Sequence, residues 1–175
     1  MKIVIFGCGG SGKSTLARKL GERLGIPVIH LDQLYWRPGW QHVTDEEFDV
    51  LLKEKLEEKE WVMDGNFNRT LPLRLKYCDM AIYLDFSRFT CLRGVLGRVI
   101  RYYGKTRPDM GADCPDHFDL EFLAWVWNFN KNNRSRYYQI LSEQEGKEVH
   151  ILRKRREIKG LIEMIAKKPD EPVHM

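Results

Sequence analysis

A glycine-rich stretch near the N-terminus, residues 7–15, has the spacing of a phosphate-binding loop. Its sequence, Gly-Cys-Gly-Gly-Ser-Gly-Lys-Ser-Thr, matches the pattern G-x-x-x-x-G-K-[ST] and follows an apolar run, residues 2–6, that predicts a buried strand. Glycines let the backbone wrap a phosphate with its N–H groups pointing inward, and a helix beginning near Lys13 adds the positive end of its dipole. The stretch therefore predicts a site for the phosphates of ATP or a similar nucleoside triphosphate.

Each polar side chain of this loop has an expected task. Lys13 would place a positive charge on the β- and γ-phosphates, Ser14 would offer its hydroxyl to Mg²⁺, and Thr15 would contact the α-phosphate. The other positions expected to bind the nucleotide are Gly7, Gly9, Gly10, Ser11 and Gly12.

Three aspartates, Asp32, Asp64 and Asp85, follow predicted strands and so are expected at one edge of a sheet, where ligands of open α/β sheets bind. Asp64 and Asp85 each end an apolar run and compete for the role of the acid beside the metal. We favour Asp64, because it also opens the loop of residues 65–69. Asp32 is a candidate to accept a proton from an acceptor hydroxyl or to bind the waters of the metal. Capping of a helix or loop is the alternative for all three.

Charge is segregated in the second half of the chain. Residues 86–108 contain six Lys or Arg and no acid, whereas residues 109–121 contain five acids and no Lys or Arg. These segments are either two solvated faces or an anion-binding arm with an acidic partner that folds back near it. Arg98 and Arg101 lie three apart on one predicted helix face, so both can address one anion, and we expect them to be catalytic, with Arg98 also binding the nucleotide.

Short apolar runs alternate with helical patterns along the chain. The expected strands are residues 2–6, 27–30, 61–64, 80–85 and 148–152, and the expected helices are residues 13–24, 44–59, 71–77, 87–103, 117–142 and 155–167. This alternation favours an α/β sandwich with a parallel sheet. The helix of residues 44–59 should begin with Thr44 and Glu47 in a capping box.

Several aromatic and basic residues allow two interpretations. Tyr35, Trp36 and Trp40 either form a small core, which we favour, or stack on a ligand, so Tyr35 and Trp36 are kept as candidate substrate contacts. The basic run 153–156 either lies near the adenine ring or binds a polyanion, or is a solvated helix start. An aromatic stripe in the predicted helix 117–142 is interpreted as core; its members are Phe118, Phe122, Trp125 and Phe129.

Composition narrows the class of protein. The chain has 175 residues, 43% hydrophobic and 31% charged, which is typical of one globular domain over residues 1–175. It contains neither an apolar run of about 20 residues nor a signal peptide, so we expect a cytoplasmic protein without membrane contact. The net charge is only +4 and the sequence has no DNA-reading motif, so it supports nucleic-acid binding only weakly. The four scattered cysteines are expected to be free thiols, and the tail from Pro169 to be frayed.

Several stretches resemble the P-loop kinases of small substrates, the adenylate- and shikimate-kinase-like group, and within it the bacterial family labelled DNA topology modulation protein. Besides the glycine-rich loop they are His-Leu-Asp-Gln-Leu-Tyr-Trp at 30–36, Asp-Gly-Asn-Phe-Asn-Arg at 64–69, Tyr-Leu-Asp at 83–85, Arg-Pro-Asp-Met-Gly at 107–111, Phe-Asp at 118–119 and Trp-Asn-Phe at 127–129. The resemblance implies a three-layer α/β/α P-loop NTPase fold whose five-stranded parallel sheet has the order 2-3-1-4-5. It also implies a substrate-binding helical insert after the second strand, at about residues 31–60, and a lid after the fourth strand, at about residues 101–116.

The resemblance also implies roles for further residues. Asp64 would lie near the Mg²⁺ shell, and Arg69 would hold the phosphate of an acceptor, although the spacing between them is one residue longer than in adenylate kinases and a proline is missing. Arg134 and Arg136 match arginines on the helix leaving the lid and are candidate substrate ligands. The expected activity is phosphoryl transfer from Mg-ATP to a small nucleotide-like or hydroxyl acceptor by a monomer or homodimer. The alternatives are a nucleotide-regulated modulator of DNA topology or expression without kinase activity, and an NTPase switch.

Overall fold

Five apolar runs form the central parallel sheet. They are β1 (Lys2–Gly7), β2 (Val28–His30), β5 (Trp61–Asp64), β6 (Met80–Leu84) and β7 (Glu148–Leu152). In a computed structural model, which describes residues 1–166, they are arranged β2-β5-β1-β6-β7, all parallel. Counted along the chain, this is the expected order 2-3-1-4-5. Near-continuous apolar strands of this kind are buried on both faces, which requires helices on each side.

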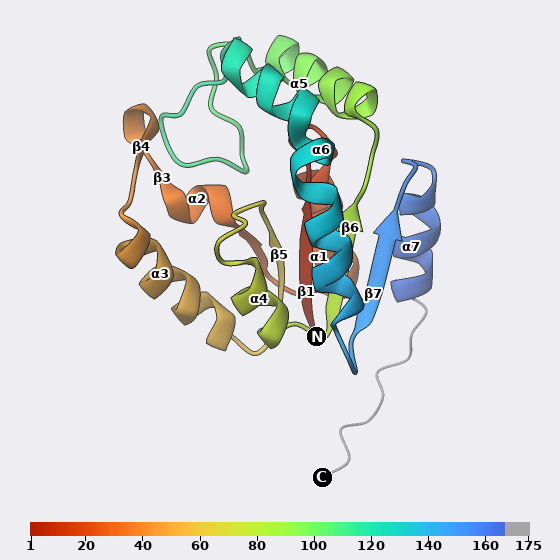
Figure 1. Cartoon of the computed structure of the whole chain (residues 1–175). Coiled ribbons are helices and arrows are strands. Elements are labelled where there is room, and N and C mark those ends of the chain that lie inside the picture. The colour runs from red at the N-terminus through yellow and green to blue at the C-terminus, as the bar shows by residue number, and fades with distance from the viewer. Residues whose placement is uncertain (167–175) are drawn as a thin grey trace.

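Helices cover both faces of the sheet (Figure 1). One face is covered by α1 (Lys13–Leu24), which contacts β5, β1 and α7 (Glu157–Ala166). The opposite face carries α4 (Leu71–Tyr77) and α6 (Leu120–Ser142), which packs Tyr137 against Phe6 of β1 and Tyr83 of β6. α5 (Arg88–Tyr102) lies beyond the end of the sheet and packs on α6. The three layers confirm the predicted fold class.

Strand register brings the carboxyl ends of the strands together. Asp64 pairs with His30 of β2 on one side and with Ile5 of β1 on the other. On the far side of β1, Gly7 pairs with Leu84, the residue before Asp85. The residues that follow these strands therefore share one edge of the sheet, where the glycine-rich loop also lies.

The segment after β2 forms an insert of small elements. It contains α2 (Leu31–Tyr35), a hairpin of β3 (Trp36–Arg37) and β4 (Gln41–His42) around η1 (Pro38–Trp40), and α3 (Asp45–Glu57). Thr44 Oγ1 accepts a hydrogen bond from Glu47 N at 3.1 Å, which confirms the predicted cap of α3. The sequence prediction missed α2 and the hairpin.

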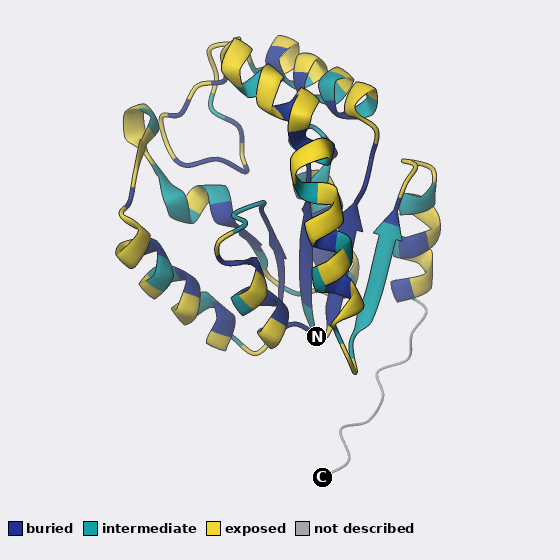
Figure 2. Ribbon diagram, in the orientation of Figure 1, coloured by how far each residue is buried: buried dark blue, intermediate teal, exposed yellow. Residues whose placement is uncertain are grey.

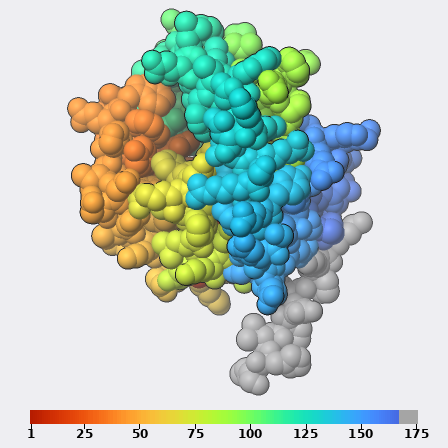
Figure 3. Space-filling model, in the orientation of Figure 1, coloured from red at the N-terminus to blue at the C-terminus, as the bar shows by residue number. Residues whose placement is uncertain are grey.

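The irregular segment of residues 103–119, between α5 and α6, overlaps the lid expected at about residues 101–116 and is here called the lid. It closes on itself through bridges between Tyr103 and Asp116 and between Thr106 and Pro115. It also rests on the insert, because Trp40 Nε1 donates to Pro115 O at 3.1 Å and Gln33 Nε2 donates to Pro108 O at 2.7 Å. In the space-filling view the orange insert and the green-to-cyan lid adjoin at one end of the molecule (Figure 3).

Burial follows the layers (Figure 2). β1, β5 and β6 are almost wholly buried, and the outer faces of α3, α5 and α6 are exposed. All four cysteines are buried and free, as expected from their spacing. No helix within residues 1–166 is both long and apolar enough to cross a bilayer. The end of the last predicted helix, Lys167, and the tail from Pro169 lie outside the described residues.

Candidate functional site

The glycine-rich loop curls between β1 and α1 at the floor of a cavity of about 1880 Å³. Residues 9–15 line this cavity, whereas Gly7 ends β1 and packs on Leu84. Lys13 Nζ donates to Cys8 O at 3.0 Å, so the ammonium group folds back over the loop that it would serve. Backbone N–H groups and one ammonium at the start of a twelve-residue helix make a strong anion site.

Ser14 connects the loop to the sheet edge. Its Oγ donates a hydrogen bond to Asp64 Oδ2 at 2.8 Å, and the other oxygen of Asp64 pairs with His30 Nδ1. Burial favours neutral His30, but the hydrogen bond and negative charge of Asp64 outweigh it, so the pKa of His30 is raised. The result is a buried histidine that orients the carboxylate beside Ser14. Sequence reasoning assigned His30 no role.

The two acids that competed for the place beside the metal have different neighbours. Asp64 contacts Ser14, whereas Asp85 pairs with Arg134 Nη2 at 2.8 Å and accepts a hydrogen bond from Tyr138 at 2.9 Å. Residues 1–166 contain no cluster of three or more His, Cys, Asp or Glu that would hold a metal without other ligands. Mg²⁺ in phosphoryl-transfer sites commonly takes one or two protein oxygens and completes its shell with phosphates and water. The Ser14 and Asp64 oxygens fit that requirement.

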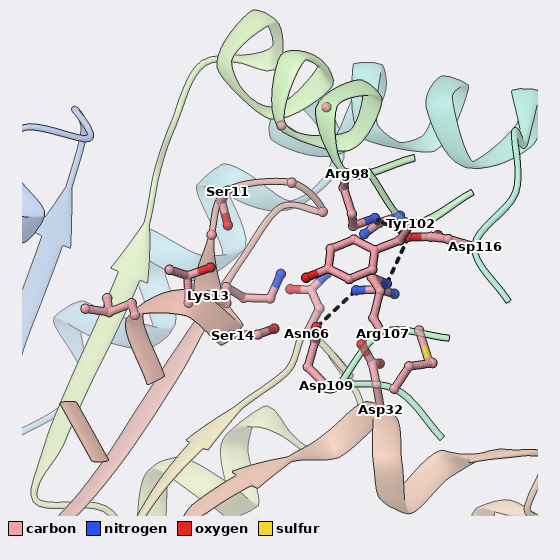
Figure 4. Close-up of a pocket in the computed structure, with 18 of the residues that line it drawn as sticks. Ser11, Lys13, Ser14, Asp32, Asn66, Arg98, Tyr102, Arg107, Asp109 and Asp116 are labelled. Atoms are coloured by element: carbon pink, nitrogen blue, oxygen red, sulfur yellow. Dashed lines mark hydrogen bonds and ion pairs between the residues drawn. The ribbon is translucent and has the colours of Figure 1, made fainter. Parts of the chain in front are cut away.

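Asp32 faces the same cavity from the first turn of α2 (Figure 4). Burial, followed by the negative charge of Asp64, raises its pKa from 3.8 to about 6. A carboxylate with such a pKa is ionised at neutral pH and is a stronger base than a solvated aspartate. The placement of Asp32 is compatible with removal of a proton from a bound hydroxyl.

The lid and α5 bring arginines and acids over the loop (Figure 4). Asp116 Oδ2 lies 3.2 Å from Arg98 Nε and 3.0 Å from Arg107 Nε, and Arg107 Nη1 lies 3.0 Å from Asp109 Oδ2. Although burial favours its neutral form, the charge of Arg107 holds the pKa of Asp109 below its ordinary value. The acidic segment thus folds back on the basic one. Arg101 also lines the cavity, with its guanidinium 5.7 Å from the centre of the Tyr102 ring.

The insert supplies one aromatic wall of the cavity. Trp36 and Trp40 line it, with ring centroids 5.4 Å apart and nearly perpendicular. Tyr35 lies behind them instead, with ring centroids 5.4 Å from Phe48 and 4.9 Å from Phe67. The structure therefore divides the group: Tyr35 belongs to a small core under the insert, and Trp36 faces the ligand space.

Three predicted substrate ligands lie outside the main cavity. Arg69 points along the outer side of the insert, where its Nη1 lies 2.9 Å from Asp49 and its Nη2 3.3 Å from Asp45. Arg134 is held by Asp85, and Arg136 is exposed on α6. None of the three lines the cavity, so their predicted contacts with a substrate have no support in this arrangement.

The aromatic stripe of α6 is not the core stripe that we predicted. Only Phe129 is fully buried, at 1% exposure, whereas Phe118 is 54% and Trp125 41% exposed. Phe122 and Trp125 line the cavity, and the Phe122 ring lies 5.4 Å from the Arg98 guanidinium. The reason is that α6 extends beyond the sheet, so its first turns cover the glycine-rich loop.

Further cavity residues had either an open interpretation, as the basic run 153–156 did, or no assigned role. Arg155 Nη2 donates to Gly10 O at 3.1 Å, which places the basic run after β7 beside the loop. The other lining residues without an assigned role include Arg18, Asn66, Arg93, Arg107, Asp109 and Asp116. The uneven charge of residues 86–121 was the available signal for the lid members, whereas Arg18 and Asn66 carry none.

Comparison with known proteins agrees with this geometry at the level of fold. No family model matches the chain. Two curated proteins described as "Putative adenylate kinase", from Pyrococcus furiosus and Pyrococcus abyssi, are 32% and 30% identical to it over 82 residues. Each match covers 43% of this chain and 46% of the relative, so the chain spans less than half the length of these proteins.

Solved kinase structures match over nearly the whole chain. A deoxyadenosine kinase from M. mycoides with bound dATP is 17% identical to this chain, with a TM-score of 0.57. The match covers 94% of this chain and 97% of the kinase chain. A shikimate kinase from Bacteroides thetaiotaomicron is 15% identical, with a TM-score of 0.53, over 94% and 95% of the two chains. The protein therefore has the fold of nucleoside and shikimate kinases.

Proposed function

We propose that this protein is an ATP-dependent kinase that transfers the γ-phosphoryl group of Mg-ATP to a small acceptor. The observation that carries the proposal is the gathering of four groups around one lidded cavity: the Lys13 ammonium, the Ser14–Asp64 pair, the Asp32 carboxylate and the Arg98 guanidinium. Phosphoryl transfer needs positioning, a metal ion and cations around the moving phosphoryl group rather than covalent catalysis by the protein. A lid favours transfer over hydrolysis, because it keeps water from the reacting atoms.

Each group has a defined task in the proposed reaction. The loop amides and Lys13 hold the β- and γ-phosphates, and Arg98, with Arg101 beside it, neutralises charge on the transferring group. Bound Mg²⁺ would be held by Ser14 and Asp64 and would neutralise phosphate charge. Asp32 accepts the proton of the attacking hydroxyl. The fold shared with a deoxyadenosine kinase crystallised with dATP supports a nucleotide ligand.

The alternative of a DNA-directed modulator is less well supported. Four of the six cations in residues 86–108, Arg93, Arg98, Arg101 and Arg107, line the cavity instead of forming an outer basic face. A fifth cation, Arg88, contacts α6 instead: its guanidinium lies 4.7 Å from the centre of the Trp127 ring. Their placement suits phosphates of a small ligand inside the protein.

Replacement of Lys13 tests the proposal. In Lys13→Ala we expect ADP release from Mg-ATP to fall at least about a hundredfold, since a charge on the transferring group is lost. Lys131→Ala, which removes an exposed lysine of α6, is the matched control and should retain wild-type activity. ATP binding by calorimetry and coupled ADP release, with and without excess EDTA, are the measurements. Equal ATP affinity and turnover in both variants would contradict the proposed site.

A further inference from the structure

The cavity has room for a second ligand beside ATP. Its volume of about 1880 Å³ exceeds the roughly 300–1,000 Å³ of ordinary small-molecule sites. The loop, α5 and the start of α7 surround the part expected to hold the triphosphate. The remainder, here called the acceptor side, is lined by the insert, residues 66–68 and the lid.

The arginines that reach the acceptor side are already paired with carboxylates. Arg107 is only 8% exposed and lies 3.0 Å from both Asp109 and Asp116. Asp116 also pairs with Arg98, and Arg18 Nη1 lies 3.9 Å from Asp109. Sites that recognise phosphate esters instead offer an arginine fork whose donors are open to the ligand.

The acceptor side thus has no spare positive charge for a phosphate dianion. The insert and the lid place Asp32, Asp109 and Asp116 there with Arg107, whereas Arg98 of α5 and Arg18 of α1 pair with two of these carboxylates from outside it. Arg69, the side chain expected to clamp an acceptor phosphate, is bound by Asp45 and Asp49 on the outer surface. A monophosphate entering here would face carboxylates and would have to break these ion pairs.

The same wall offers groups that suit an uncharged, flat, hydroxylated molecule. Trp36 and Trp40 present indole rings, which bind planar apolar faces. Asn66 Oδ1 lies 3.2 Å from the Tyr137 hydroxyl, which also contacts Asn68 Oδ1. The Asn66 side chain lies in the cavity beside Arg107 and Asp109, where its amide NH₂ group can donate to a ligand (Figure 4). Asp32 supplies an acceptor for a hydroxyl.

We propose that the acceptor is an uncharged nucleoside, not a nucleoside monophosphate, with its ring against Trp36 and its reacting hydroxyl at Asp32. The proposal rests on the kinase function above and defines its acceptor. In the reaction the hydroxyl oxygen forms a bond to the γ-phosphorus, and the bond from that phosphorus to the β–γ bridging oxygen breaks. ADP leaves with the electron pair, and the hydroxyl proton passes to the Asp32 carboxylate.

Matched pairs of acceptors test the proposal. Coupled ADP release from Mg-ATP is measured with adenosine, deoxyadenosine, cytidine and deoxycytidine, each against its 5′-monophosphate. We expect at least one nucleoside to stimulate release with kcat/KM at least about tenfold above that of its monophosphate. A preference for monophosphates, or stimulation by neither member of any pair in a protein that binds ATP, would overturn it. Failure to bind ATP by calorimetry would instead contradict the kinase proposal itself.

A charge variant tests the stated cause of this selectivity. Asp116→Asn removes the carboxylate shared by Arg98 and Arg107, so kcat/KM for the monophosphate should rise at least about fivefold relative to that for the nucleoside. Asp113→Asn, an exposed acid of the same lid, should leave the ratio unchanged. A gain of monophosphate use does not arise from misfolding. An unchanged ratio in a folded Asp116→Asn protein would show that the ion pairs do not select the acceptor.

Discussion

In the proposed reaction, Asp32 would serve catalysis at the expense of stability. Its carboxyl group lies among Asp64, Asp109 and a buried sheet edge, and its pKa is raised to about 6. The folded protein therefore holds this proton more tightly than the unfolded chain does. As the pH rises through about 6 the folded state loses stability, because an unfavourably placed negative charge appears.

Replacement of Asp32 should separate the two effects. In Asp32→Asn we expect phosphoryl transfer to fall by about 10²–10⁴-fold, since the base is lost. The free energy of unfolding at pH 8 should rise by on the order of 1 kcal/mol, which is less than the full pKa shift implies because the Asp32 side chain is partly exposed to water. This gain in stability should vanish below about pH 4. Urea unfolding at pH 4 and pH 8 and coupled ADP release measure this. A stability change that is equal at both pH values would refute the assigned pKa, and Glu46→Gln on the exposed face of α3 is the control.

Activity of the wild-type protein should depend on pH through the same group. Only the ionised carboxylate accepts a proton, so kcat/KM for the free enzyme should rise as the pH increases through about 6. The rise should be absent from the residual activity of Asp32→Asn. The same rising limb in both proteins would assign it to another group.

At the scale of elements, the glycine-rich loop depends on α5 as much as on β1 and α1. Gly10 has φ of 74°, and a Cβ atom at this position would lie 2.2 Å from Cys91 O of α5. From the other side, a Cβ at Gly94 would lie 2.0 Å from Gly10 O. The helix that carries Arg98 is thus packed backbone to backbone on the glycine-rich loop, so it sets both the shape of the loop and the position of the arginine.

Two glycines of α5 provide a matched test of this contact. Gly94→Ala should lower the free energy of unfolding by roughly 1–3 kcal/mol and weaken ATP binding, because the new methyl group overlaps the loop. Gly97 lies three residues further along and also lines the cavity, but a Cβ there would meet no protein atom within 4 Å. Gly97→Ala should therefore leave the free energy of unfolding unchanged or raise it by up to about 1 kcal/mol through helix propensity. Thermal unfolding and ATP calorimetry distinguish them. Similar behaviour of the two variants would mean that α5 does not constrain the loop.

Local sequence signals predicted the elements whose structure is local. The strands, the loop and the Thr44 cap could be predicted because apolar runs, glycine spacing and capping residues act over a few positions. The hairpin of β3 and β4, each of two residues, is too short for such a pattern. The stripe of α6 was misread because periodicity identifies a helix face but not what that face meets: Phe129 is buried in the core, whereas Phe122 lines the cavity.

At the scale of the whole molecule, the candidate site is assembled from segments that lie far apart in the sequence. Asp32 and Asp64 could be predicted at one edge because parallel strands share their carboxyl ends. The pairing of Arg98 with Asp116 and of Arg155 with Gly10 depends on how the lid and α7 fold back, which no short-range pattern encodes. Arg69 and Arg134 lie outside the cavity for the same reason: Asp49 of α3 and Asp85, the residue after β6, hold them elsewhere.

The lid and the insert are joined across the mouth of the cavity. Trp40 donates to Pro115 O, Gln33 donates to Pro108 O, and the backbone N–H of Gly39 donates to Asp113 O at 3.0 Å. Trp40 has φ of 60°, an unfavourable conformation for a bulky side chain, so tertiary contacts must hold it. A ligand that leaves must therefore break contacts between two segments rather than move one free loop.

Loss of a single lid contact should loosen both segments together. In Trp40→Phe a smaller aromatic ring remains but the indole N–H is lost, and removing a hydrogen bond worth about 1 kcal/mol should raise amide exchange roughly fivefold. The increase should appear both in residues 104–116 and in residues 36–42, because each holds the other. Hydrogen exchange read by mass spectrometry measures this, with Trp127→Phe, an exposed tryptophan of α6 against Phe89, as the control. Faster exchange in the insert alone would contradict this coupling. It would show that the lid keeps its conformation without the insert, so that the lid could also open without moving Trp36.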